Sequence, residues 1–167
     1  MKENNNSMNA FVTNYFDEII STNPWAGTPV ERYYALPNSA KGSTGESIVE
    51  SILKEKGYDV KPRTNAGHDR IINGRKTEIK FCLATKRNTN FRTTFNHIGF
   101  NKDWEDILFV CINGDGEIAS ALYSKDNFPH ELVHHQQGGN SSGNDDFMIS
   151  GKQSVDILFN SAAIKLF

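Results

Sequence analysis

The chain has 167 residues and a net charge of −2 at pH 7, and its 37% hydrophobic residues are enough for the core of one domain of ordinary size. No apolar run approaches the ~20 residues that a membrane-spanning helix needs. The N-terminal MKENNNS lacks the apolar segment of a signal peptide, and two cysteines in apolar runs are typical of buried thiols in a reducing compartment. We therefore expect a single cytoplasmic domain over residues 1–167, with no membrane partner and with residues 1–7 as a disordered tail.

Charge is distributed unevenly along the chain. Residues 54–92 carry 11 of the 18 lysines and arginines but only 4 of the 20 acids, a net charge of +7 that leaves −9 for the rest. A surface built from this basic segment would attract a polyanion such as nucleic acid. A solvated basic face without a ligand explains the charge equally well.

Two helices are expected in the N-terminal third. Apolar residues at helical spacing predict a helix over residues 8–20, and prolines and glycines then indicate a loop over 21–42. The second helix, over 43–56, opens with Ser43-x-x-Glu46, which is the pattern of a capping box, and ends at a glycine.

Strands are predicted after the second helix. Asn73-Gly74 is a strong hairpin signal, because both residues tolerate positive φ. The polar, basic and aromatic stretch 84–105 is expected to contain a short helix. The predicted strands cover residues 58–61, 68–72, 75–83, 106–112 and 117–123.

The order of these elements favours an α/β fold in which helices flank a mixed central sheet. The continuous apolar run 106–112 is typical of a strand that is buried on both faces. Residues 138–146 form a glycine-rich loop, and the apolar segments 155–159 and 162–167 are compatible with either a helix or a strand.

The hairpin predicts a cluster of charged side chains. A two-residue turn at Asn73-Gly74 would place Asp69 directly opposite Glu78, and Lys80 would point to the same face of the sheet. Two opposed carboxylates repel unless a cation lies between them, and Mg²⁺ commonly binds one or two carboxylates together with water and phosphate oxygens. The pattern therefore indicates metal-assisted hydrolysis of a phosphodiester, although ordinary surface ion pairs would also account for these residues.

These residues resemble the PD-(D/E)xK nuclease superfamily, which includes many type II restriction endonucleases. Asp69 matches the first acid of the motif and Glu78-Ile79-Lys80 matches ExK, whereas His68 replaces the proline. The resemblance covers about residues 43–123, as the catalytic core, and implies a restriction-endonuclease-like core of order αβββαβ. It also implies Mg²⁺, one or two ions per site with Mn²⁺ as a substitute.

The resemblance also implies roles for individual residues. Asp69, Glu78 and the main-chain carbonyl of Ile79 would bind the metal, and Lys80 would position the attacking water. The first core helix of the family often supplies another acid, for which Glu46 fits best and Glu50 is the substitute. Glu46 could equally serve only as the partner of Ser43 in the capping box.

Several further side chains are candidates for contacts with DNA. Basic groups neutralise phosphates, and asparagine, glutamine and arginine can reach base edges. The candidates are Arg63, Lys76, Lys86, Arg87, Arg92, Asn96, His97, Gln136 and Gln137.

A competing motif is His130-Glu131-Leu132-Val133-His134. On a helix the two histidines would lie one turn apart and could bind Zn²⁺, with Glu131 as the general base of a metalloprotease. Glycines at 138 and 139 leave room for barely two helical turns, and no histidine follows His135 to act as a third ligand.

The function that we expect from the sequence is a Mg²⁺-dependent endonuclease that cleaves double-stranded DNA, most like a sequence-specific type II restriction enzyme. Cutting both strands of a palindromic site with a small chain implies a homodimer. A structure-selective nuclease related to Holliday-junction resolvases, a zinc metalloprotease and a catalytically inactive DNA-binding module remain alternatives.

Overall fold

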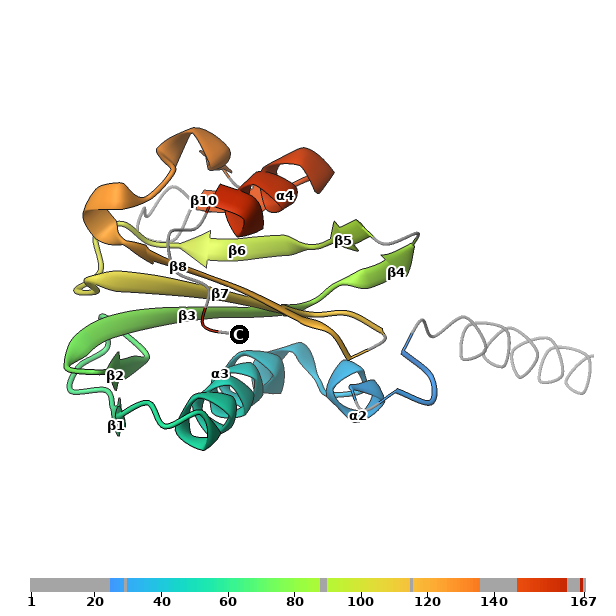
Figure 1. The fold of residues 1–167 in the computed structure, drawn as a ribbon, viewed down its shortest axis with the longest axis horizontal. Helices are drawn as coiled ribbons and strands as arrows, with labels where there is room; N and C mark the ends of the chain where they lie inside the picture. Colours follow the sequence, from blue (N-terminus) through green and yellow to red (C-terminus); the bar gives the residue numbers. More distant parts are fainter. Residues whose placement is uncertain are drawn as a thin grey trace, which may run out of the picture.

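The computed structural model describes residues 25–28, 30–87, 90–114, 116–135, 147–161 and 166 (Figure 1). The predicted tail, the helix over 8–20, the loop over 138–146, Gln136 and Gln137 lie outside these residues. The side chains of residues 85–87 and 90–92 also fall outside the description. No helix in the described ranges is long and apolar enough to cross a membrane.

A five-stranded mixed sheet in the order β1-β2-β3-β7-β8 forms the centre of the molecule. Strands β3 and β7 run parallel and the other neighbours are antiparallel. The predicted mixed α/β class is thus confirmed, and β3 and β7 have the bounds expected from the sequence. The strands are β1 (Val60–Pro62), β2 (Arg70–Ile72), β3 (Arg75–Leu83), β7 (Asp106–Ile112) and β8 (Ile118–Ser124).

A second layer lies over one face of this sheet (Figure 1). It contains a three-stranded sheet in the order β6-β10-β9, a β4–β5 pair and helix α4. The short 3₁₀ turns η1 (Lys125–Asn127) and η2 (His130–Leu132) lead from β8 into β9. The remaining bounds are β4 (Thr85–Arg87), β5 (Asn90–Arg92), β6 (Thr94–Ile98), β9 (His134–His135), β10 (Phe147–Ser150) and α4 (Lys152–Ser161).

The short helix predicted within 84–105 is wrong, because this stretch forms β4, β5 and β6. Its threonines and phenylalanines favour strands, but β6 pairs with β10, which lies about fifty residues further along the chain. The local sequence pattern of residues 84–105 contains no information about so distant a partner. The apolar residues 155–159, whose pattern suits either a helix or a strand, belong to α4.

The helices α2 (Glu31–Tyr34) and α3 (Asn38–Glu55) occupy much of the stretch predicted as a loop over 21–42. Helix α3 begins after Pro37, five residues earlier than expected. The sequence did not predict this early start, because the first half of α3 is rich in glycine and serine, which are poor helix formers. Ser43 is therefore inside the helix, where its Oγ donates to the Ala40 carbonyl (3.3 Å), and the predicted capping box is wrong.

The central sheet is covered on both faces. Helix α3 packs Val49 and Leu53 against one face, where they meet Leu108 and Val110 of β7. On the other face, Phe109 of β7 packs under the second layer. Every residue of β7 is buried, which confirms the strand predicted to be covered on both sides.

Gly45 allows α3 to lie close to β3. A Cβ at this position would lie 2.7 Å from Cδ1 and 2.9 Å from Cβ of Phe81. We expect Gly45→Ala to lower the free energy of unfolding by about 1–2 kcal/mol, because overpacking costs ~1–3 kcal/mol and outweighs the helix propensity that alanine gains. Urea denaturation measures the change.

Gly42→Ala is the matched control for this prediction. It lies in the same helix, and nothing is within 4 Å of the Cβ that it would add. Here only the helix propensity changes, so we expect the free energy of unfolding to rise by up to about 1 kcal/mol. If both variants changed stability by the same amount and sign, close packing against Phe81 would not be the cause.

Candidate functional site

The β2–β3 hairpin has the predicted two-residue turn. Asn73 and Gly74 both have positive φ, 49° and 84°, as a type I′ turn requires. Ile72 faces Arg75, and the pairing continues to Arg70 opposite Thr77. The register deduced from the sequence is therefore confirmed over the length of β2.

Asp69 lies just before β2, at the point where the ladder ends. Its N–H donates to the Thr77 carbonyl (3.0 Å), while Arg70 is the ladder partner of Thr77, so two residues face one as at a β-bulge. The Asp69 carboxylate accepts the Ile79 N–H through Oδ2 (2.7 Å). Asp69 thus binds the main chain of β3 next to Glu78 instead of forming a regular pair with it.

Glu78 is held by two ammonium groups. It is only 3% exposed, and its Oε1 contacts Lys80 Nζ at 2.8 Å and Lys102 Nζ at 3.4 Å. Lys102 follows β6, and its carbonyl accepts a hydrogen bond from Lys125 Nζ (2.8 Å), which fixes this segment. Lys102 was not among the predicted site residues, and its place in a basic and aromatic stretch was the only sequence signal for it.

Arg70 connects α3 to the hairpin. Its guanidinium contacts Glu50 at 2.6 Å and Glu46 at 3.3 Å, and it also donates to the Asp69 carbonyl (2.7 Å). These contacts bring Glu46 beside Asp69. Glu50 also pairs with Lys54 (2.6 Å). Glu46 is therefore the additional acid of the cleft, whereas Glu50 is engaged by two cations.

The pKa values of these acids are shifted in different directions. Burial raises the pKa of Asp69, and the neighbouring charge of Glu78 raises it further. Burial also raises the pKa of Glu46, with the charge of Asp69 as the next cause. In contrast, hydrogen bonds from Lys54 and then Arg70 lower the pKa of Glu50. The site thus disfavours the ionised forms of Asp69 and Glu46, whereas it favours the ionised form of Glu50.

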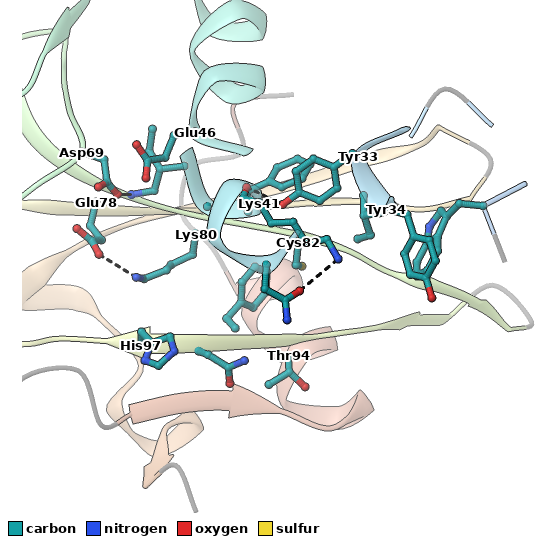
Figure 2. Close-up of a pocket in the computed structure, with 18 of the residues that line it drawn as sticks. Tyr33, Tyr34, Lys41, Glu46, Asp69, Glu78, Lys80, Cys82, Thr94 and His97 are labelled. Carbon is teal, nitrogen blue, oxygen red and sulfur yellow. Dashed lines mark hydrogen bonds and ion pairs between the residues drawn. The ribbon is translucent and has the colours of Figure 1, made fainter. Parts of the chain in front are cut away.

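These groups lie at one end of a cleft of about 570 Å³. Figure 2 shows Asp69, Glu78 and Lys80 together at this end, with Glu46 above them. β2 pairs with only the first residues of β3, so the rest of β3 forms the floor of the cleft. The walls come from α2 and α3 on one side and from β6 on the other. Among the lining residues are Tyr33, Tyr34, Lys41, Cys82, Asn96, His97 and Lys102.

The donor atoms at this end are oxygens, which suit Mg²⁺ or Mn²⁺. In the described part of the chain, no group of three or more histidine, cysteine or acidic side chains could hold a metal ion. Mg²⁺ commonly takes only one or two carboxylates and completes its shell with water and phosphate oxygens. Because the Ile79 N–H points to Asp69, its carbonyl points to the same edge of β3 and adds a third oxygen. The residues present therefore fit an open magnesium site.

Only some of the residues predicted to contact DNA lie at the cleft. Asn96 and His97 line the cleft, and exposed Arg63 lies close enough to Glu46 for its charge to affect the pKa of that acid. Lys76 pairs instead with Asp103 on the surface (2.7 Å). Lys86, Arg87 and Arg92 belong to β4 and β5, in the part whose side chains are not described.

The helix that the competing zinc motif requires is not formed. His130 lies in the 3₁₀ turn η2, whereas His134 lies in β9 and bonds Ser150 Oγ through Nε2 (2.9 Å). His130 packs against the ring of Phe100. The two histidines are therefore not successive residues on one helix face, so the arrangement that the competing zinc motif requires is not formed.

The sequence matches no protein-family model and no curated protein. What the chain can do follows from the cleft itself. Its acidic end combines two neighbouring carboxylates, a third acid on α3 and two ammonium groups at fixed positions. Two of these carboxylates, completed by water, could bind a divalent cation, and the ammonium groups could bind an anion next to it.

Proposed function

We propose that this protein is a Mg²⁺-dependent DNA endonuclease with a restriction-endonuclease-like core. The observation that carries the proposal is the meeting of Asp69, Glu78 and Lys80 at one end of the cleft, with Lys80 Nζ 2.8 Å from the Glu78 carboxylate. The confirmed hairpin register and the mixed sheet support it, since both are needed to bring these three residues together.

Asp69, Glu78 and the Ile79 carbonyl would hold the metal. When bound, the metal would supply the charge that polarises the phosphodiester and lowers the pKa of a water molecule. Lys80, which the Glu78 contact holds in place, donates a hydrogen bond to the attacking water and orients it toward the phosphorus. Lys102 adds positive charge beside the phosphate. The products expected from the family resemblance have 5′-phosphate and 3′-hydroxyl ends.

The substrate that we propose is double-stranded DNA, cut as a type II restriction enzyme cuts it. The +7 charge of residues 54–92 supports a polyanionic substrate. Arg63 and Lys80 place part of this charge at or near the cleft, and Lys102 adds a further positive charge there. Cleavage of both strands would require a homodimer with two-fold symmetry.

The test is cleavage of unmodified phage DNA with and without Mg²⁺, by the wild type and by Lys80→Ala. We expect discrete fragments from the wild type only when Mg²⁺ is present. Lys80→Ala should reduce the rate ~10²–10⁴-fold, because it removes the group that positions the water. Agarose gels and single-turnover rates measure both effects.

Lys152→Ala is the matched control, since Lys152 lies on α4 and pairs with Asp156. It should cleave at the wild-type rate. Preference for four-way junctions over linear duplex would indicate a junction resolvase, and a uniform smear would indicate a nonspecific nuclease. Intact DNA in both Mg²⁺ and Mn²⁺ would refute the proposed function.

A further inference from the structure

His97, the last residue but one of β6, has an unusual backbone conformation. Among the non-glycine residues that the structure describes, it shares positive φ (57°) only with Asn73. Asn73 is in a tight turn, where asparagine readily adopts this conformation. Histidine adopts it at an energetic cost, so the conformation of His97 needs a cause.

The cause lies in the pairing of β6 with β10. Phe95 pairs with Ile149 and Ile98 pairs with Phe147, so Asn96 and His97 together lie opposite the single residue between these partners. This arrangement is a β-bulge. Phe95 and Ile98 are buried and hold both ends of the bulge in the core. The extra residue therefore has to leave the sheet, and it does so on the cleft side.

The His97 ring lies in the cleft, across from Glu78 and Lys80 (Figure 2). It is exposed, and it makes no hydrogen bond to any part of the chain that the structure describes. Among the described residues, therefore, no hydrogen bond to the ring offsets the backbone strain. Strained residues and bulges that re-aim a side chain into a cleft are characteristic of binding and catalytic sites.

We propose that His97 donates a hydrogen bond to a non-bridging oxygen of the phosphodiester, which lies between the His97 ring and Lys80. Imidazole has at least one N–H in either protonation state, so it can donate to an anion. The floor of the cleft already supplies the ammonium of Lys80 and the carboxylate of Glu78, and His97 supplies a donor on the wall that β6 forms. This inference rests on the proposed nuclease function, and it gives His97 a direct contact with the phosphodiester that is cleaved.

Two variants separate this role from a structural one. His97→Gly removes both the donor and the strain, whereas His97→Asn keeps an N–H donor on a residue that tolerates positive φ. We expect the melting temperature of His97→Gly to equal or exceed that of the wild type. Its single-turnover cleavage of phage DNA in Mg²⁺ should nevertheless fall ~10–100-fold, with His97→Asn between the two.

Cleavage activity should therefore fall across these variants without a matching fall in melting temperature. His134→Asn is the control, because His134 is an exposed histidine on β9 outside the cleft, and it should cleave at the wild-type rate. If His97→Gly cleaves as fast as the wild type, or if activity simply follows stability across the variants, the role of His97 is refuted while the nuclease function stands. If the wild type cleaves no DNA in Mg²⁺ or Mn²⁺, both proposals fail.

Discussion

Asp69→Asn is expected to abolish Mg²⁺-dependent cleavage and at the same time to stabilise the metal-free protein. Cleavage should fall by about 10³-fold or more, because a carboxamide is a much weaker magnesium ligand and the metal contributes several kcal/mol to catalysis. The new side chain has the same shape, and its oxygen can still accept the Ile79 N–H that now bonds Asp69 (2.7 Å). The fold should therefore remain intact.

The stabilisation follows from the raised pKa of Asp69, which burial and then the charge of Glu78 cause. A raised pKa in the folded state means that Asp69 favours folding while it is protonated and loses this contribution as the pH rises through its folded pKa. At neutral pH the buried charge destabilises the wild type, and Asp69→Asn lacks this charge. Below the pKa of the unfolded chain, where aspartate is protonated in both states, the difference should vanish.

Urea denaturation in a chelator at pH 7 and pH 3 measures this difference, and phage DNA cleavage measures activity. Asp59→Asn is the control, because Asp59 is an exposed acid whose carboxylate pairs with Lys61 (3.0 Å). It should keep the wild-type cleavage rate. A variant Asp69→Asn that is less stable than the wild type at pH 7 would show that the protein already compensates the charge of Asp69.

Glu78→Gln is expected to abolish cleavage to a similar extent but to destabilise the protein. Glu78 is almost fully buried between Lys80 and Lys102, at 2.8 and 3.4 Å. Loss of its charge weakens two charge-assisted hydrogen bonds and leaves two ammonium groups without their shared anion. The free energy of unfolding should fall by about 1–3 kcal/mol.

Glu55→Gln gives the baseline for this comparison, since Glu55 is an exposed acid in the last turn of α3. Its stability should change by less than ~0.5 kcal/mol and its activity should not change. Asp69→Asn and Glu78→Gln should therefore reduce cleavage to a similar extent but change stability in opposite directions, a combination that an ordinary surface acid would not give. If Glu78→Gln were as stable as the wild type, the lysine contacts would contribute little to folding.

Much of the hairpin could be predicted because its determinants are local. Asn73-Gly74 specifies the turn, the turn fixes the register, and the alternation of strand residues then places Glu78 and Lys80 on one face. Strand β7 was equally predictable, because a short, continuous apolar run is typical of a strand that is covered on both faces. The irregular pairing of Asp69 was not predictable, since a bulge shifts one residue without changing the composition of the segment.

The wall of the cleft that β6 forms could not be predicted from the sequence. β6 is a strand because β10 pairs with it from the other side of a long connection, and Lys102 reaches Glu78 only through that arrangement. Glu46 was identified, but the capping pattern gave it a competing role that the early start of α3 removes. For β6 and Lys102 the missing information was the identity of a distant partner.

The basic side chains around the acids determine whether the protein can fold before it binds a metal. Arg70 contacts Glu46, and Lys80 and Lys102 contact Glu78, so much of the repulsion among the acids is offset by the chain's own cations. We therefore expect the polypeptide to fold fully in a chelating buffer, before any metal binds. Under the proposed function, folding and the onset of activity are then separate steps, and the supply of ions alone starts the second.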